Sequence, residues 1–359
     1  MQALQVYAGP RARAHLLEHG LRAADVQVIP AAAGGPKGLI LNPLDQFIFG
    51  PWLGASSHTV HLLGASIGAW RMATACLNQP EREFERLAHD YIHQQYQGTP
   101  GKRPTAQAVT QGFAASLDDC FAGREGQVLS HARYRLHIFT SRGRHILGRE
   151  GRLRTPLGYA GAFGANLLRR KAMGAWLERV VFSDPRDALP LPLDDYRSCV
   201  VKLDAGNLRP SLLASCSIPF WLQAVHDIPG APLGAYWDGG ITDYHLHLNY
   251  AAMAMAVPGL VLYPHFQSSV IPGWLDKGLK RRHRATAALD NVVLLAPRPE
   301  WVATLPNAKL PDRNDFAHYA SDLPGRIKAW QTAVDESQRL RDEFAALTQR
   351  PSVQSLPLA

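Results

Sequence analysis

Short apolar runs alternate with longer helical segments along most of the chain, and this alternation constrains the fold more than any other feature of the sequence. The runs are continuously apolar and β-branched, which is typical of strands buried on both faces. Such strands, separated by helices, predict a three-layer α/β/α sandwich with a mostly parallel central sheet. The expected strands are Val26–Ile29, Val60–Leu63, Tyr134–Thr140, Val180–Phe182, Val200–Leu203, Leu260–Tyr263 and Val292–Leu295. The expected helices are Arg11–His19, Leu39–Phe47, Ile67–Leu77, Glu81–Tyr96, Leu167–Glu178, Ser211–Ser215 and Leu323–Leu347.

The domain organisation follows from the length and from the lack of a linker. A chain of 359 residues could form two domains or one large α/β domain. We found no linker, so we expect one domain over residues 1–350 with an embellished rim. Residues 97–124 and 143–171 depart from the alternation and are expected to be insertions or a cap. Residues 351–359 follow a proline and are expected to be a flexible tail.

Composition narrows the class of protein. With 46% hydrophobic and 19% charged residues, the chain is globular rather than disordered. Its four cysteines are far apart and show no Cys-x-x-Cys pattern, which argues against a zinc site and favours reduced thiols in a cytosol. The first residues do not resemble a signal peptide, and the apolar stretch 251–264 is interrupted by Pro258 and too short to span a bilayer. We therefore expect a cytoplasmic protein.

The net charge of +8 has more than one interpretation. It could serve solubility alone, or it could attract an anionic lipid surface or a nucleic acid. The sequence contains no helix-turn-helix, RNP-like strand or zinc finger, so nucleic-acid binding rests on charge alone.

A Gly-x-Ser-x-Gly pattern lies between an expected strand and an expected helix. Gly64-Ala65-Ser66-Ile67-Gly68 follows the strand that ends at Leu63. This context is the one that a nucleophile elbow requires, with Ser66 exposed above a helix N-terminus. An ordinary turn with a capping serine is the alternative.

A glycine-rich loop precedes this pattern. Gly34-Gly35-Pro36-Lys37-Gly38 follows the strand Val26–Ile29 and opens a helix. The loop could be a simple helix cap, a phosphate site or an oxyanion hole, but the phosphate and dinucleotide fingerprints are absent. Pro36 has no N–H, so the candidate donors are the amides of Gly34, Gly35 and Lys37.

Asp238 ends an apolar stretch and is followed by Gly239 and Gly240. An isolated Asp-Gly pair is usually a turn. A Ser-His-Asp triad would need a histidine after the acid, and none of the later histidines is in a glycine-flanked turn. The remaining possibility is a Ser-Asp dyad, in which Asp238 takes the proton of Ser66 directly. The histidines that follow are His245, His247, His265, His283 and His318.

Taken together, these patterns resemble the patatin-like acyl hydrolases, also called patatin-like phospholipases. That family has a Gly-Gly-x-[Arg/Lys]-Gly loop, a Gly-x-Ser-x-Gly elbow and an Asp-Gly-[Gly/Ala] turn in this order. Residues 213–220, Leu-Ala-Ser-Cys-Ser-Ile-Pro-Phe, resemble a fourth family segment between elbow and turn. The resemblance covers about residues 25–245. It departs from the family pattern at Ala32-Ala33, at Pro36 and after the aspartate, where no Asn-x-Pro follows.

The resemblance implies a patatin-like fold and an acyl hydrolase that needs no metal or cofactor. It implies Ser66 as nucleophile, Asp238 as general base and an oxyanion hole at Gly34, Gly35, Lys37 and Gly38. The implied substrates are lipid esters, such as phospholipid or lysophospholipid. Two alternatives stay open: a soluble carboxylesterase for short acyl chains, and a lipid-binding protein without turnover.

One basic segment suggests how such an enzyme could meet lipid. Residues 271–284 combine Trp274 with basic side chains, a composition that suits an anionic bilayer surface. A solvated helix face beside a core tryptophan is the alternative. A weaker hint of the same kind is Leu167-Leu168-Arg169-Arg170-Lys171. The residues expected at the membrane are Trp274, Lys277, Lys280, Arg281, Arg282 and Arg284.

Overall fold

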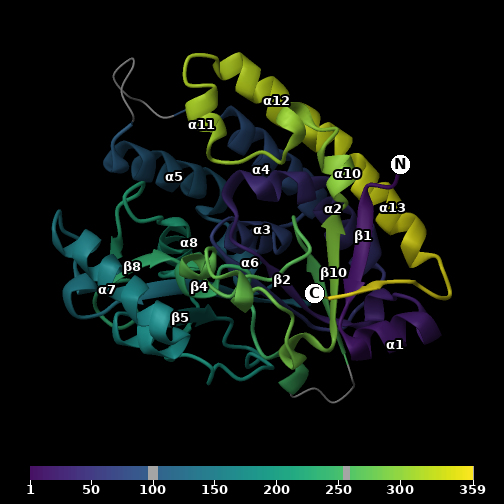
Figure 1. The fold of residues 1–359 in the computed structure, drawn as a ribbon, viewed down its shortest axis with the longest axis horizontal. Coiled ribbons are helices and arrows are strands. Elements are labelled where there is room, and N and C mark those ends of the chain that lie inside the picture. The colour runs from purple at the N-terminus through teal and green to yellow at the C-terminus, as the bar shows by residue number, and fades with distance from the viewer. Residues whose placement is uncertain (96–103, 254–258, 359) are drawn as a thin grey trace.

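A central β-sheet runs through the whole molecule. The computed structural model describes residues 1–95, 104–253 and 259–358, and its strands join one sheet in the order β11-β1-β10-β9-β2-β3-β4-β5-β6, with β8 against β4 and β7 against β8. Helices lie on both faces of this sheet (Figure 1). The three-layer α/β/α fold expected from the sequence is therefore confirmed. The strands are β1 (Leu4–Ala8), β2 (Val26–Ala31), β3 (Val60–Ala65), β4 (Tyr134–Gly143), β5 (Leu177–Ser183), β6 (Ser198–Lys202), β7 (Val225–His226), β8 (Ala235–Asp238), β9 (Leu260–Pro264), β10 (Val292–Pro297) and β11 (Leu356–Pro357).

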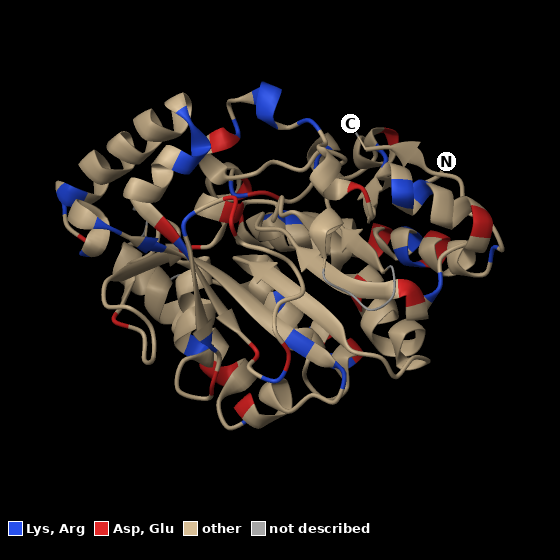
Figure 2. Cartoon of the chain, turned by 90° about the horizontal axis from the view of Figure 1, so that it is seen from below, with Lys and Arg blue, Asp and Glu red and all other residues tan. Residues whose placement is uncertain are grey.

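The centre of the sheet is parallel and its margins are mixed. The strands from β10 through β9, β2 and β3 to β4 all run parallel. Antiparallel pairs occur between β1 and β10, between β4 and β5, and where β8 joins β4. Strands β3, β9 and β10 are buried throughout, β2 and β4 are buried at most positions, and few residues of these strands are charged (Figure 2). Continuous apolar runs predicted these strands because both faces of each are covered.

Some of the expected helices differ from the observed ones only at their ends, and others are divided or absent. The α-helices are α1 (Pro10–His19), α2 (Asn42–Phe47), α3 (Ile67–Ala75), α4 (Pro80–His93), α5 (Ala106–Phe121), α6 (Glu125–Leu129), α7 (Arg154–Leu168), α8 (Leu208–Cys216), α9 (Gly240–Asp243), α10 (Pro299–Val302), α11 (Asp315–His318), α12 (Leu323–Glu336) and α13 (Gln338–Thr348). The expected helix 323–347 is divided at Ser337, whose buried hydroxyl donates to the carbonyl of Val334.

Two sequence expectations about helices are corrected. The helix expected over Leu167–Glu178 is wrong, because α7 ends at Leu168, a 3-10 helix covers Arg170–Ala175, and Leu177 already pairs in β5. Leu39–Phe47 is also not one helix: a 3-10 helix covers Gly35–Leu41 before α2 begins at Asn42. In the first case, apolar residues of a buried strand were included in a helical pattern.

The C-terminal residues pack against the sheet. Residues 356–357 form β11 on β1, and the amide of Leu358 donates to the carbonyl of Ala8. Val353 is 2% exposed, and its amide donates to the carbonyl of Leu16. The sequence treated this segment as a flexible tail, and in the structure it is instead held at the edge of the sheet.

The two segments expected to be insertions or a cap form different structures. Of residues 97–124, the part 97–103 lies outside the described residues, and most of the rest forms α5 on the outside of α8. Residues 143–171 form the end of β4, a short 3-10 helix and α7. Across the described ranges, none of the helices is both long enough and apolar enough to cross a membrane.

Candidate active site

Ser66 occupies a sharp turn between β3 and α3. Its backbone has φ 57° and ψ −130°, a left-handed conformation that is uncommon for a residue with a side chain. The turn is tight because Gly68 approaches β2 closely: a Cβ at this position would lie 2.0 Å from the carbonyl oxygen of Ala31. The small residue therefore lets α3 start directly above the sheet, with Ser66 at its N-terminus.

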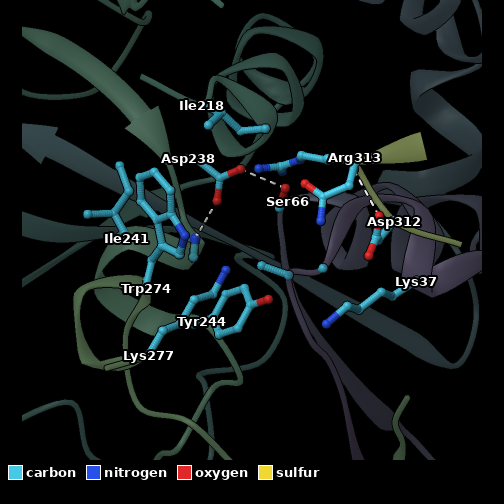
Figure 3. Close-up of a pocket in the computed structure, with 14 residues that line it drawn as sticks. Lys37, Ser66, Ile218, Asp238, Ile241, Tyr244, Trp274, Lys277, Asp312 and Arg313 are labelled. Atoms are coloured by element: carbon cyan, nitrogen blue, oxygen red, sulfur yellow. Dashed lines mark hydrogen bonds between the residues drawn. The ribbon is translucent and has the colours of Figure 1, made fainter. Parts of the chain in front are cut away.

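Asp238 meets Ser66 because β3 and β8 share one edge of β4. Ala65, the last residue of β3, pairs with Phe139 of β4, and Asp238, the last residue of β8, pairs with the next residue, Thr140. The two strands thus approach end to end along β4. The Ser66 hydroxyl donates a hydrogen bond of 2.6 Å to Asp238 Oδ2, and both residues are buried (Figure 3).

The end of α8 holds both members of this pair. The Ser215 hydroxyl accepts the Ser66 amide at 2.9 Å and donates to the carbonyl of Phe139 at 2.7 Å. The carbonyl of Ser217 accepts the Asp238 amide at 2.9 Å. These contacts show what the segment 213–220 does here: it fixes the elbow and the acid against each other.

The turn after Asp238 is equally constrained. A Cβ on Gly239 would lie 2.0 Å from the carbonyl oxygen of Phe139, so only glycine fits without a shift of β4. The Gly240 amide donates to Asp238 Oδ1 at 2.7 Å. One carboxylate oxygen is therefore held by the backbone, and the other is held by Ser66.

The glycine-rich loop lies across the cavity from Asp238, and its residues have different positions. Gly34 and Lys37 line the cavity at Ser66, whereas Gly35, with φ 57°, lines a neighbouring cleft. Gly38 does not reach either space among the described residues: it packs against Ile67 and Arg71. Three of the four expected oxyanion residues thus line a space that Ser66 also lines, and Gly38 lines neither space.

Desolvation shifts the pKa of several groups at this site, although the Lys277 side chain is partly open to solvent. Desolvation raises the pKa of Asp238, and the Ser66 hydroxyl and the Arg313 guanidinium oppose that rise. Desolvation lowers the pKa of Lys37 and lowers the pKa of Lys277 to about 7, with repulsion from Arg313 adding to the second shift. A carboxylate with a raised pKa is a better proton acceptor while it stays ionised.

Two spaces meet at Ser66. A cavity of about 210 Å³ holds Ser66, Asp238 and several cationic side chains. A larger cleft of about 640 Å³, mainly apolar, extends from Ser66 past Val109, Phe113 and Trp221. Ser66, Ile218, Arg313 and Asn314 border both spaces. This arrangement can accept a reacting group with an apolar part on one side and a small polar part on the other.

Residues 312–314 close this site, and sequence reasoning missed them. Asp312, Arg313 and Asn314 all line the smaller cavity, and Figure 3 shows Arg313 beside the Ser66–Asp238 pair. They belong to an irregular segment before α11 and are far along the chain from every motif named above. Since no local pattern marks them, their position in space is the only feature that identifies them.

The candidate histidines do not reach Ser66. None of the five that follow Asp238 borders either space. His245 and His265 are buried beside each other with ring centroids 4.3 Å apart, and His283 binds the carbonyl of Asp276. The hydrogen bond that the Ser66 hydroxyl donates therefore goes to the carboxylate of Asp238.

The basic segment 271–284 is divided between the site and the surface. Trp274 and Lys277 line the smaller cavity, and Arg282 forms a 2.7 Å ion pair with the buried Asp276. Lys277, Lys280, Arg281 and Arg284 are exposed. The segment therefore combines exposed cations with residues that line the cavity or pair with Asp276.

Within the described ranges, no group of three or more His, Cys, Asp or Glu residues is arranged to hold a metal ion.

Comparisons with known proteins do not assign this chain to a family. No family model matches the chain, and no curated protein matches it. Among solved structures, the chain is similar to the crystal structure of VipD from Legionella pneumophila, with a TM-score of 0.36 and 14% sequence identity over 95% of this chain and 70% of that one. A likeness of this size carries no argument about function, which must come from the site itself.

Proposed function

We propose that the protein is a serine acyl hydrolase that cleaves lipid esters through a Ser66–Asp238 dyad. The observation that carries the proposal is the buried 2.6 Å hydrogen bond between the Ser66 hydroxyl and Asp238, beside a glycine-rich loop. The resemblance to patatin-like hydrolases rests on the same residues and stays part of the proposal.

The reaction follows from this geometry. Asp238 Oδ2 accepts the proton of Ser66 as Oγ attacks the ester carbonyl carbon. Amides of the loop at Gly34 and Gly35 stabilise the oxyanion, with the positive charge of Lys37 nearby. The tetrahedral intermediate expels the alcohol, which takes the proton from Asp238 and leaves an acyl group on Ser66. Asp238 then deprotonates a water, the hydroxide releases the acid, and Ser66 regains its proton.

The larger cleft supports a lipid rather than a very short ester. Its wall includes Val109, Phe113, Trp221 and Leu222, and it opens directly at Ser66. An alkyl chain placed there would bury apolar surface at about 25 cal/mol per Å². A soluble carboxylesterase for short chains is the second candidate, since it would use the same dyad. A binding protein without turnover is less well supported, because the dyad is complete.

Contact with an anionic membrane remains part of the proposal, and α7 is a better candidate for it than 271–284. One face of α7 is packed on the body through Tyr159 and Asn166. Its other face, together with the preceding Leu153, is apolar and open to solvent; Leu153, Leu157, Phe163, Leu167 and Leu168 have exposed fractions of 75%, 64%, 44%, 41% and 87%.

The surroundings of that face match a bilayer surface. No residue from 155 to 168 is charged, while Arg152 and Arg154 precede this stretch and Arg169 and Lys171 follow it. Apolar side chains between basic ends suit insertion among anionic headgroups. The helix lies at the outer edge of the molecule (Figure 1), and Tyr159 contacts Phe220, next to Trp221 of the cleft wall.

Covalent labelling tests the catalytic proposal directly. A fluorophosphonate probe should label the wild type at Ser66 and should not label Ser66→Ala. Asp238→Asn should lose at least 100-fold in kcat because the proton acceptor is gone. Both variants should also lose activity on phospholipid vesicles and on short esters. Full esterase activity of Ser66→Ala would refute the dyad, whereas activity on short esters alone would favour the carboxylesterase.

A further inference from the structure

We infer that the smaller cavity is a binding site for an anionic group, such as a phosphate, on the alcohol side of the scissile ester. The inference rests on the proposed function, because it assigns one part of the substrate of that site. It is carried by Lys277, Arg313 and Lys37, whose cationic side chains line one cavity with Ser66.

Lys277 is held over two aromatic rings instead of a carboxylate. Its Nζ lies 4.1 Å from the ring centroid of Tyr244 and 5.6 Å from that of Trp274. Both rings also line the cavity. Cation–π contacts orient an ammonium group without neutralising it, so its charge stays available to a ligand.

Asp276, the residue before Lys277, anchors the backbone of this segment. The buried Asp276 accepts hydrogen bonds from Asn166 at 2.8 Å and from Arg282 at 2.7 Å, and it pairs with Arg170 at 3.3 Å. This network fixes the backbone from which Lys277 projects. A site built in this way is preorganised, and a preorganised site loses less entropy when a ligand binds.

Arg313 approaches from the opposite wall. Its Nε lies 3.2 Å from the position that a Cβ on Gly35 would occupy, so the guanidinium extends across the glycine-rich loop. It forms no ion pair with a carboxylate of the described residues. Figure 3 shows it next to Ser66 and Asp238, across the cavity from Lys277.

Lys37 completes the cationic lining, with its Nζ 5.3 Å from the ring centroid of Phe266.

The carboxylates at this cavity compensate its positive charge only in part. Asp238 is bound by Ser66 and by the Gly240 amide. Asp312 forms a 2.9 Å ion pair with Lys309 and accepts the Asn314 amide at 2.8 Å. Cations near Ser66 therefore outnumber the acids that face them, and an anionic ligand would relieve their mutual repulsion.

The two spaces suit different parts of an ester substrate. The larger cleft is mainly apolar and suits the acyl chain, which leaves the smaller cavity for the alcohol portion. Since Ser66 lies where the two spaces meet, an ester carbonyl there would have its alkyl chain on one side and its charged group on the other. The expected substrate is thus an ester whose alcohol carries a compact anion close to the ester bond.

A binding experiment tests the inference without depending on turnover. Titration calorimetry at pH 6.5 would compare hexyl phosphate, 1-hexanol and inorganic phosphate on Ser66→Ala protein. Hexyl phosphate should bind at least tenfold more tightly than either of the others, because it uses both spaces. Equal binding of hexyl phosphate and 1-hexanol would overturn the inference, and equal binding of hexyl phosphate and inorganic phosphate would overturn the assignment to an ester alcohol.

Substitutions test whether Lys277 contributes to the binding of hexyl phosphate. Adding Lys277→Met should weaken hexyl phosphate about tenfold or more, as expected when a charged hydrogen-bond donor is lost. Lys277→Arg should restore most of the affinity, and Lys328→Met on the exposed surface of α12 should leave it unchanged. A loss with Lys328→Met equal to that with Lys277→Met would overturn the inference.

Kinetics on matched esters separate this inference from the proposed function. Wild type should prefer an ester with an anionic alcohol over its neutral analogue, and Lys277→Met should reduce that ratio about tenfold. Hydrolysis without charge preference would refute the anion site and leave the hydrolase standing. Binding of hexyl phosphate by a protein that hydrolyses no ester would refute the hydrolase and leave the anion site standing.

Discussion

The backbone of Ser66 is in the left-handed region, and the residues around it hold that conformation in place. Ser215 binds the Ser66 amide, while Gly68 allows α3 to lie close to β2. Strain of this kind is usually maintained where a side chain must be presented in one orientation. Here the orientation directs Oγ to Asp238.

At the residue scale, the sequence was informative where chemistry depends on local backbone shape. Ser66 and Asp238 could be selected because their turns need neighbouring glycines, which are visible in the sequence. Arg313 could not be selected, since its position depends on a loop packing against Gly35 from 278 residues further along the chain. Lys277 was noticed only as a surface charge, because its aromatic contacts are absent from any local pattern.

The pH dependence of substrate preference should report on Lys277. Its pKa is lowered to about 7, so the side chain is charged below that pH and loses its charge as the pH rises through it. Between pH 6 and pH 9, the KM for a phosphodiester-bearing ester should therefore rise about tenfold relative to that of a neutral ester. Steady-state kinetics on both esters measure this ratio, from which any titration of Asp238 cancels.

The matched variant for that prediction is Lys277→Arg, which stays charged across the whole range. Its ratio should be nearly independent of pH. A wild-type ratio that does not change between pH 6 and pH 9 would contradict the role of Lys277.

At the element scale, the sequence located buried strands well and short or peripheral elements poorly. β8 was not predicted as a strand, yet it places Asp238 beside β4. The helix expected over residues 167–178 is wrong because the apolar Leu177 is buried as part of strand β5 and not on the face of a helix. The pattern of apolar residues indicates which side chains are buried, but for a short run it does not distinguish a buried helix from a buried strand.

α7 should act as a membrane contact. Replacing Leu157 and Leu168 by Asp puts charge on its exposed apolar face and should reduce binding to phosphatidylglycerol vesicles at least tenfold, as measured by cosedimentation. Activity on a soluble short ester should not change, because both side chains point into solvent.

Two controls separate α7 from general charge effects. Val200→Asp changes an exposed apolar residue on β6 and should leave vesicle binding intact. Replacing Lys280, Arg281 and Arg284 by Glu tests the basic segment expected from the sequence. If that triple variant loses binding and the α7 variant does not, the contact runs through residues 271–284.

At the scale of the whole molecule, the site depends on a strand order that the sequence does not contain. β3 and β8 are separated by about half of the chain, and they meet because both pair with β4. Motif order along the chain could suggest that Ser66 and Asp238 act together. The register that makes their side chains meet, Ala65 opposite Phe139 and Asp238 opposite Thr140, comes from long-range pairing.

The C-terminal segment provides a test of how the whole sheet is stabilised. Removal of residues 351–359 would expose the edge of β1, open the site of Val353 and delete backbone hydrogen bonds to Leu16 and Ala8. Burial of one valine contributes about 1.5–3 kcal/mol, and each hydrogen bond adds about 1 kcal/mol. The truncated protein should thus lose about 3.5–5 kcal/mol of unfolding free energy in urea titration.

The active site should be insensitive to the same truncation. β11 is five strand positions from β3 in the sheet, which at about 4.8 Å per strand corresponds to roughly 24 Å. Changes at that distance with no shared partners are usually independent. The kcat and KM of the truncated protein should therefore equal those of the full chain at a temperature where both are folded. If the segment were a frayed tail, its removal would change neither stability nor activity, so an unchanged urea midpoint would contradict its docking on β1.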